Sequence, residues 1–221
     1  MIRGFIFDLD GTLADTIDDI GWAVNRMLES RGFPTLTRAD HLANINNGAF
    51  KLIQRSIPEI YRGDEAFVRS CLAEYESFYS THYAVDTYIY PDLDRVLRDF
   101  SNAGYRLAVL SNKQDAYVKN IVEKLFFGIP FVCAQGQTEL PTKPDPTAAL
   151  MIAERMGLSP SEIAFVGDSQ VDVATAKNAG MISVAVAWGY RPVSLLVEEG
   201  AEVTVSDAEE LSFLPEMLKT R

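Results

Sequence analysis

Short apolar runs recur along this chain, and stretches with helical periodicity separate most of them. Continuous apolar runs of this length, rich in β-branched and aromatic residues, are typical of strands buried on both faces of a sheet. Strands that alternate with helices connect as right-handed βαβ units. The sequence therefore predicts an α/β fold with a doubly wound parallel sheet. The apolar runs cover residues 5–7, 107–110, 130–133, 163–166, 182–187 and 203–205.

One long stretch, residues 16–83, breaks this alternation. It contains no convincing strand, whereas apolar residues recur in it at helical spacing. Thr37 stands where an N-cap is expected, and Asp64 precedes the last of these helical patterns. We therefore expect a helical domain, residues 16–83, inserted into a core that consists of residues 1–15 and 84–221. His41 and His82 have no partner at metal-ligand spacing, so we expect them to lie at the surface or to pack within this domain.

Composition excludes several classes of protein. The 221 residues include 31 acidic and 20 basic side chains, for a net charge of −11, which argues against a nucleic-acid partner. No apolar run approaches the ~20 residues that a membrane span needs, and two aspartates interrupt the apolar N-terminus, so neither a membrane partner nor a signal peptide is expected. The two cysteines do not form a disulfide framework. We expect a cytoplasmic protein, and the sequence leaves its oligomeric state open.

Polar residues follow several of the predicted strands. Asp8 and Asp10 leave the first strand, and Asp168 and Asp172 follow a later one. The carboxyl ends of parallel strands meet at one edge of a sheet, so these carboxylates are expected to share a site. Clustered carboxylates repel one another unless a cation lies among them, and oxygen donors without His or Cys select Mg²⁺.

Such a site suits a phosphoryl group. Lys143 and Mg²⁺ would offset the charge on its oxygens, and Ser111 and backbone N–H groups of the turn after Asp8 could donate to them. One carboxylate can attack phosphorus to form an aspartyl-phosphate. A second carboxylate two residues on can protonate the leaving alcohol and then deprotonate water.

These motifs, taken in order, resemble those of the haloacid dehalogenase superfamily, whose core is Rossmann-like and whose helical insertion is a cap. The matching segments are Asp8-Leu9-Asp10-Gly11-Thr12-Leu13, Ser111-Asn112, Lys143, and Gly167-Asp168-Ser169 with Asp172. The resemblance implies that Asp8 is the nucleophile and Asp10 the general acid/base, with Lys143 as a third catalytic residue. It implies metal ligation by Asp8, Asp10 (through its carbonyl) and Asp168, with metal support by Asp172 and Ser169; orienting Lys143 is the alternative role of Asp172. It implies phosphate binding by Gly11, Ser111, Asn112 and Lys143.

Weaker stretches resemble the phosphoglycolate phosphatases of this superfamily: Asn47-Gly48-Ala49 with Leu52 and Arg55, Ser111-Asn112-Lys113, and Trp188-Gly189-Tyr190. They imply a small phosphorylated metabolite as substrate, with 2-phosphoglycolate preferred. Substrate specificity is assigned to Asn47, Gly48, Lys51 and Arg55, with Asn46 and the Trp188 loop as further candidates. A solvated basic edge is the alternative interpretation of Lys51 and Arg55.

Other functions stay open on the sequence alone. A sugar phosphomutase such as a β-phosphoglucomutase would use the same aspartates but return the phosphoryl group to the substrate. A pyrophosphatase or a broad sugar-phosphate phosphatase would share the same signatures. A non-catalytic binding module is disfavoured because every signature is intact, and a dehalogenase is disfavoured by Asp10 and the Thr12 turn.

Overall fold

A computed structural model describes residues 1–219. Within them the chain forms two compact units. The sheet unit comprises Met1–Ala14 and the described residues from Ile89 onward, and the helical unit comprises Asp15–Tyr88. The boundaries fall inside two short strands, β2 (Ala14–Asp15) and β3 (Tyr88–Ile89), which pair with each other. Neither strand is predicted from the sequence, because two residues are too few to show an alternating pattern.

A six-stranded parallel sheet forms the centre of the sheet unit, in the order β5-β4-β1-β6-β7-β8. Its strands are β1 (Gly4–Phe7), β4 (Arg106–Gln114), β5 (Phe131–Gln137), β6 (Ile163–Gly167), β7 (Ile182–Val186) and β8 (Val203–Val205). In register, Phe5 of β1 lies between Leu107 and Ala164 of its two neighbours. The predicted doubly wound α/β fold is confirmed, and each apolar run corresponds to a strand.

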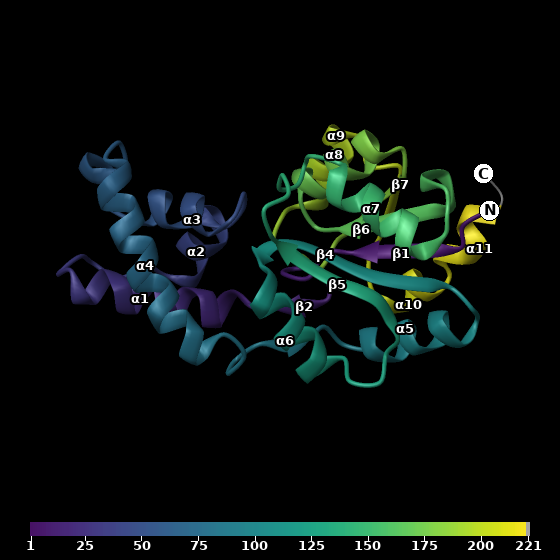
Figure 1. Cartoon of the computed structure of the whole chain (residues 1–221), viewed down its shortest axis with the longest axis horizontal. Helices are drawn as coiled ribbons and strands as arrows, with labels where there is room; N and C mark the ends of the chain where they lie inside the picture. Colours follow the sequence, from purple (N-terminus) through teal and green to yellow (C-terminus); the bar gives the residue numbers. More distant parts are fainter. Residues whose placement is uncertain (220–221) are drawn as a thin grey trace. The chain divides into compact units, whose positions relative to one another are not determined.

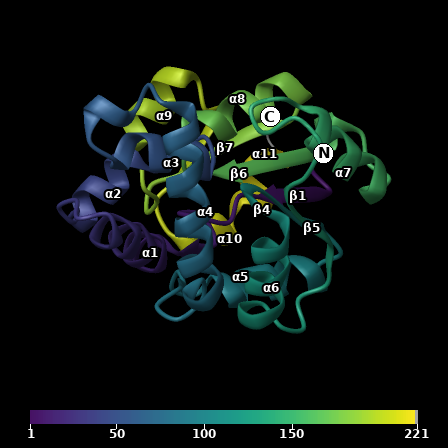
Figure 2. The same ribbon diagram turned by 60° about the vertical axis from the view of Figure 1, so that its left-hand side comes forward.

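Helices cover both faces of this sheet. Figures 1 and 2 show α7, α8 and α9 on one face and α5, α6 and α10 on the other. This is the arrangement that right-handed crossovers produce when the strand order reverses about β1. The helices of the sheet unit are α5 (Leu93–Asn102), α6 (Asp115–Leu125), α7 (Thr147–Met156), α8 (Gln170–Ala179), α9 (Val193–Glu199), α10 (Ala208–Ser212) and α11 (Leu214–Lys219), with a 3₁₀ turn at Pro160–Glu162.

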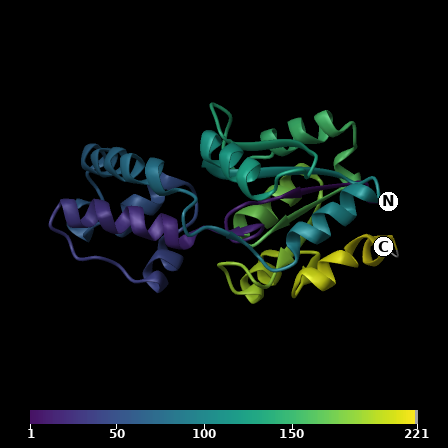
Figure 3. The same cartoon turned by 90° about the horizontal axis from the view of Figure 1, so that it is seen from below.

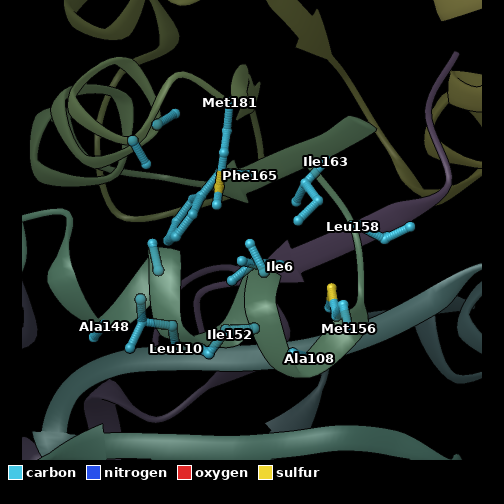
Figure 4. Packing of buried hydrophobic residues seen from close by; sticks show 14 residues of the cluster. Ile6, Ala108, Leu110, Ala148, Ile152, Met156, Leu158, Ile163, Phe165 and Met181 are labelled. Atoms are coloured by element: carbon cyan, nitrogen blue, oxygen red, sulfur yellow. The ribbon is translucent and has the colours of Figure 1, made fainter. Parts of the chain in front are cut away.

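One core cluster of the sheet unit lies between its central strands and the α7–α8 layer. Figure 4 shows Ile6, Leu110 and Phe165 from three adjacent strands meeting Ile152 and Met156 of α7. All five residues are buried. Burial of apolar side chains on this scale, at about 1.5–3 kcal/mol each, fixes the strand register and hence the positions of the residues that follow each strand.

The helical unit contains α1 (Ile17–Ser30), α2 (Arg38–Asn44), α3 (Ala49–Ser56), a 3₁₀ turn (Glu59–Tyr61) and α4 (Glu65–His82). Figure 3 shows α1 (purple) and α4 (blue) side by side. Thr37 is the N-cap of α2, as predicted, and the structure shows that Asp64 is the N-cap of α4. His41 of α2 is buried against Gly21 of α1.

None of the helices in the described part of the chain is both long and apolar enough to cross a membrane.

Candidate active site

Asp8, Lys143 and Asp172 form a buried ion-paired group at the carboxyl edge of the sheet. The Lys143 ammonium Nζ lies 2.9 Å from Asp8 Oδ1 and donates a hydrogen bond of 2.6 Å to Asp172 Oδ1. All three residues are less than a tenth exposed. The other Asp172 oxygen accepts from the backbone N and hydroxyl of Ser169 at the start of α8. Asp172 therefore links the lysine to the helix that follows β6.

Asn112 holds the backbone of Lys143. Its side-chain amide donates to the Lys143 carbonyl at 3.0 Å, and its amide oxygen accepts from the Lys143 N–H at 2.9 Å. This reciprocal pair joins the end of β4 to the loop before α7. The structure thus gives Asn112 a part in positioning Lys143.

Asp168 lies in a tight pocket of backbone. Its carboxylate accepts from the Thr12 hydroxyl at 3.3 Å and from the Tyr190 backbone N at 2.7 Å. A Cβ atom at Gly11 would lie 2.4 Å from Asp168 Oδ2, and one at Gly189 would lie 2.1 Å from Asp168 Cβ. Only glycine at both positions lets two loops approach this carboxylate so closely.

The Trp188 loop belongs to the site. Trp188 donates from its indole Nε1 to the Thr12 carbonyl at 3.0 Å. This bond ties the loop after β7 to the turn after β1, next to the Asp168 contacts. The sequence left this loop undecided between a simple turn and the rim of a site.

Burial and mutual repulsion shift the protonation of the aspartates. Burial, opposed by Lys143 and reinforced by Asp172 and Asp10, raises the pKa of Asp8 to about 7. Burial, together with Asp172 and Asp8, raises the pKa of Asp168 well above its ordinary value. Although burial alone lowers the pKa of Lys143, the carboxylates of Asp172 and Asp8 raise it above that of a free lysine.

The carboxylates fit a hard divalent cation. Oxygens of Asp8, Asp168 and Asp172 lie within 4.8 Å of one another, and all three residues are buried. Oxygen donors of this kind suit Mg²⁺. Asp8 Oδ1 has no hydrogen-bond partner within the described residues, although Lys143 is close. A cation beside Asp8 and Asp168 would stabilise the ionised forms that burial disfavours.

Asp10 is paired with a lysine that the sequence analysis did not assign to the site. Lys113 Nζ donates to Asp10 Oδ1 at 2.8 Å, and the two side chains are 7% and 16% exposed. Lys113 follows Ser111 and Asn112 at the end of β4. The sequence signal that could have located Lys113 is its position directly after the predicted phosphate-binding residues Ser111 and Asn112.

Two further predicted phosphate-binding residues are Ser111, near the end of β4, and Gly11, in the turn after β1. Ser111 is buried, and its Oγ accepts from the Lys113 backbone N at 3.3 Å. The backbone N–H of Gly11 donates to the Ala14 carbonyl at 2.9 Å. For Gly11 the structure shows a close approach to the Asp168 carboxylate.

The residues predicted to read the substrate lie in the helical unit, on α3 and in the loop that precedes it. Arg55 donates to the carbonyls of Asn44 and Asn46 at 3.0 Å each and to Asn47 Oδ1 at 3.1 Å. Lys51 donates to Gln54 on the same helix. Backbone φ is positive at Asn46, Asn47 and Gly48, a conformation that costs free energy for residues other than glycine. Arg55 thus holds a strained loop together.

Comparison with known proteins agrees with this geometry. The family model described as "Haloacid dehalogenase-like hydrolase" matches residues 5–186. A phosphoglycolate phosphatase of Pseudomonas syringae pv. tomato is 32% identical over 210 residues, covering 93% of this chain and 77% of that protein. A crystal structure from Lactobacillus delbrueckii subsp. bulgaricus, assigned as a phosphoglycolate phosphatase, superposes with a TM-score of 0.89 at 29% identity, covering 96% of this chain and 97% of the other.

The same fold occurs in phosphomutases. A β-phosphoglucomutase from Clostridium difficile superposes with a TM-score of 0.75 at 20% identity over 99% of this chain and 97% of its own. At that identity the likeness concerns the fold alone. The chain belongs to the haloacid dehalogenase-like hydrolase family, and it is a phosphatase of that family.

Proposed function

We propose that this protein hydrolyses a small phosphate monoester through an aspartyl-phosphate, with Mg²⁺ as cofactor and 2-phosphoglycolate as substrate. The observation that carries the proposal is the buried contact of Lys143 with Asp8, beside Asp168 and Asp172. A carboxylate, an ammonium and a cation-binding group together match what phosphoryl transfer needs. The names of the relatives support the choice of substrate.

In the first step an Asp8 carboxylate oxygen attacks phosphorus. A phosphorus–oxygen bond forms to Asp8, the ester bond breaks, and protonated Asp10 gives its proton to the leaving alkoxide. Lys143 Nζ, which lies 2.9 Å from Asp8, is placed to bind an oxygen of the phosphoryl group. Asp172 and Asn112 keep Lys143 in that position.

In the second step water attacks the aspartyl-phosphate. Asp10, now ionised, takes a proton from the water, the bond between Asp8 and phosphorus breaks, and inorganic phosphate leaves. Asp8 and Asp10 are thereby restored for another turnover. The ion pair with Lys113 keeps the Asp10 carboxylate beside the site.

The carboxylates of Asp8 and Asp168 and the backbone carbonyl of Asp10 would hold Mg²⁺. When bound, this cation supplies positive charge that offsets the phosphoryl oxygens and keeps Asp8 ionised. Asp172 and Ser169 support the cluster through Lys143 and the start of α8.

Substitution of the two aspartates tests the mechanism. Asp8→Asn should abolish hydrolysis because an amide is a poor nucleophile. Asp10→Asn should lower kcat about 10²–10⁴-fold, the usual contribution of a general acid/base. The measurement is phosphate release from a panel of phosphorylated metabolites and an aryl phosphate, with circular dichroism as the folding control. Wild-type turnover by Asp8→Asn would refute the mechanism.

The same panel separates the phosphatase from the phosphomutase. With a hexose 1-phosphate, hydrolysis releases inorganic phosphate, whereas a mutase forms the isomeric hexose 6-phosphate. We expect phosphate release and no isomer, and formation of the isomer would contradict the proposed function.

A further inference from the structure

Lys113 is a buried cation that forms an ion pair with Asp10. Its ammonium lies 2.8 Å from Asp10 Oδ1, and its side chain is 7% exposed. The other lysine of the site, Lys143, contacts Asp8 and Asp172. Removing an ammonium from water is costly unless anions surround it, so the position of Lys113 requires a function or a structural reason.

The position beside Asp10 is on the leaving-group side of the reaction. In the proposed mechanism Asp8 bonds to phosphorus, whereas Asp10 exchanges a proton with the ester oxygen. A group that contacts Asp10 therefore lies next to whatever substituent the ester oxygen carries. In a phosphorylated 2-hydroxy acid that substituent places a carboxylate one carbon from the ester oxygen. An ammonium has three N–H donors and can bind two anionic oxygens at once.

From this placement we infer that Lys113 binds the carboxylate of the substrate and gives the enzyme its preference for phosphorylated 2-hydroxy acids; this inference rests on the proposed function. Lys113 is then a specificity-determining residue of the sheet unit. The preference is built next to the reacting atoms, where a carboxylate one carbon from the ester must lie.

Contacts in the helical unit agree with this assignment. The guanidinium of Arg55 already bonds Asn44, Asn46 and Asn47, and the ammonium of Lys51 bonds Gln54. These cations serve the loop and helix to which they belong. A cation that binds the substrate carboxylate should instead lie next to a group that takes part in the reaction. Lys113 does so through its ion pair with Asp10.

The charge of the site makes a simple loss of activity ambiguous. When all its groups are ionised, the site has two more carboxylates than ammonium groups, and a divalent cation would offset this excess of negative charge. The groups counted are Asp8, Asp10, Asp168, Asp172, Lys113 and Lys143. Removing Lys113 also leaves Asp10 without this partner, so every phosphate ester should react more slowly. Only a comparison of two esters isolates the contribution of the carboxylate.

The test compares 2-phosphoglycolate with 2-hydroxyethyl phosphate, in which a neutral CH₂OH replaces the carboxylate. The ratio of their kcat/KM values is measured with Mg²⁺ for wild type, Lys113→Met, Lys113→Gln and Lys113→Arg. The usual strength of a hydrogen bond to a charged group sets the expected effect: Lys113→Met and Lys113→Gln should lower this ratio about 10- to 100-fold. Lys113→Arg, which keeps the charge, should preserve most of the preference.

Lys119→Met is the matched control. Lys119 is also paired with an aspartate, Asp115, but it lies exposed on α6. This variant should leave the ratio unchanged. Thermal melts show whether each variant folds, and the two uncharged substitutions at position 113 provide independent opportunities for a folded variant.

The outcomes separate the two proposals. If wild type hydrolyses both esters and a folded Lys113→Met or Lys113→Gln lowers both equally, Lys113 only positions Asp10 and the inference is wrong. An unchanged preference in these variants is equally contrary to it. If wild type hydrolyses neither ester, the proposed function fails and the inference fails with it.

Discussion

Asp8 lies in surroundings that oppose the charge its proposed role requires. Its pKa of about 7 arises mainly from burial, and the repulsion of Asp172 and Asp10 adds to it while Lys143 opposes it. Reactive carboxylates are commonly tuned by burial in this way. The physical consequence is a coupling between protonation of Asp8, binding of a cation and stability of the fold.

This coupling predicts that, without metal, the difference in thermal stability between wild type and Asp8→Asn depends on pH. A carboxyl group whose pKa rises from 3.8 to about 7 on folding stabilises the protein below pH 4, and this contribution is lost as pH rises toward 7. Asn does not titrate. Melting temperatures of both proteins in EDTA should therefore shift in favour of Asp8→Asn between pH 4 and 7. A constant difference across this range would contradict the shifted pKa.

At the scale of elements, two features of the helical unit connect packing to stability. The first is the loop before α3, in which Asn46, Asn47 and Gly48 all have positive φ. Three hydrogen bonds from Arg55 offset the cost of this conformation. The second is the contact of α1 with α2, where Gly21 leaves room for the buried imidazole of His41.

Arg55→Ala should destabilise the helical unit by about 1–3 kcal/mol, since it leaves carbonyls of a strained loop without donors. Activity should fall by the same factor for 2-phosphoglycolate and for 2-hydroxyethyl phosphate, because we assign the carboxylate to Lys113. Arg69→Ala is the control, because Arg69 is exposed and pairs with Glu65 on the same helix. A selective loss of 2-phosphoglycolate hydrolysis would return Arg55 to the substrate-reading role that the sequence suggested.

His41 should make the helical unit sensitive to acid. Burial lowers its pKa, although Asp40 and Asp18 counteract the effect, and neither ring nitrogen has a hydrogen-bond partner among the described residues. A base whose pKa is lowered on folding contributes stability above its ordinary pKa of 6.5, and this is lost as pH falls.

His41→Leu should remove that part of the pH dependence. Between pH 6.5 and the lowered pKa of His41, the wild-type protein should lose up to about 1.4 kcal/mol of unfolding free energy per pH unit from this group, and the leucine variant should not. Urea titrations at pH 5 and pH 7.5 measure the difference. Parallel stability losses in the two proteins would show that His41 does not titrate differently on folding.

At the scale of the whole molecule, the carboxyl edge of the sheet unit is a candidate cation site assembled from distant segments. Asp8 follows β1, whereas Asp168 and Asp172 follow β6, so the cation should bind the folded chain and not the unfolded one. A ligand of this kind stabilises the native state by mass action.

Mg²⁺ should therefore both activate and stabilise the protein. At a concentration 100 times its Kd, it should add about 2.7 kcal/mol to the unfolding free energy. EDTA should abolish turnover and Mg²⁺ restore it. Ca²⁺ should not restore activity, because its bonds of about 2.3–2.6 Å and higher coordination number displace the attacking oxygen. Full turnover in metal-free buffer would reject the site.

The architecture of the sheet unit could be predicted because its signals are local. Apolar runs such as Phe5-Ile6-Phe7 indicate burial on both faces of the sheet. In the helical unit, the N-cap Thr37 marks the start of α2 in the same local way. The aspartates proposed to be catalytic could be located for the same reason: polar residues directly after buried strands must lie at the carboxyl edge of a parallel sheet. Strands β2 and β3 were not predicted, because a strand of two residues is too short to show an alternating pattern.

The partners of long polar side chains were decided only by the tertiary structure. Lys113 and Asp10 are 103 residues apart, and their pairing depends on β4 lying beside β1. The reach of Asn112 to Lys143, and the engagement of Arg55 by its own loop, likewise depend on where segments meet. Periodicity and composition fix which face of a strand or helix is buried. They do not fix which of several nearby charges a flexible side chain meets, because that choice is made by distances of a few ångströms between segments that only folding brings together.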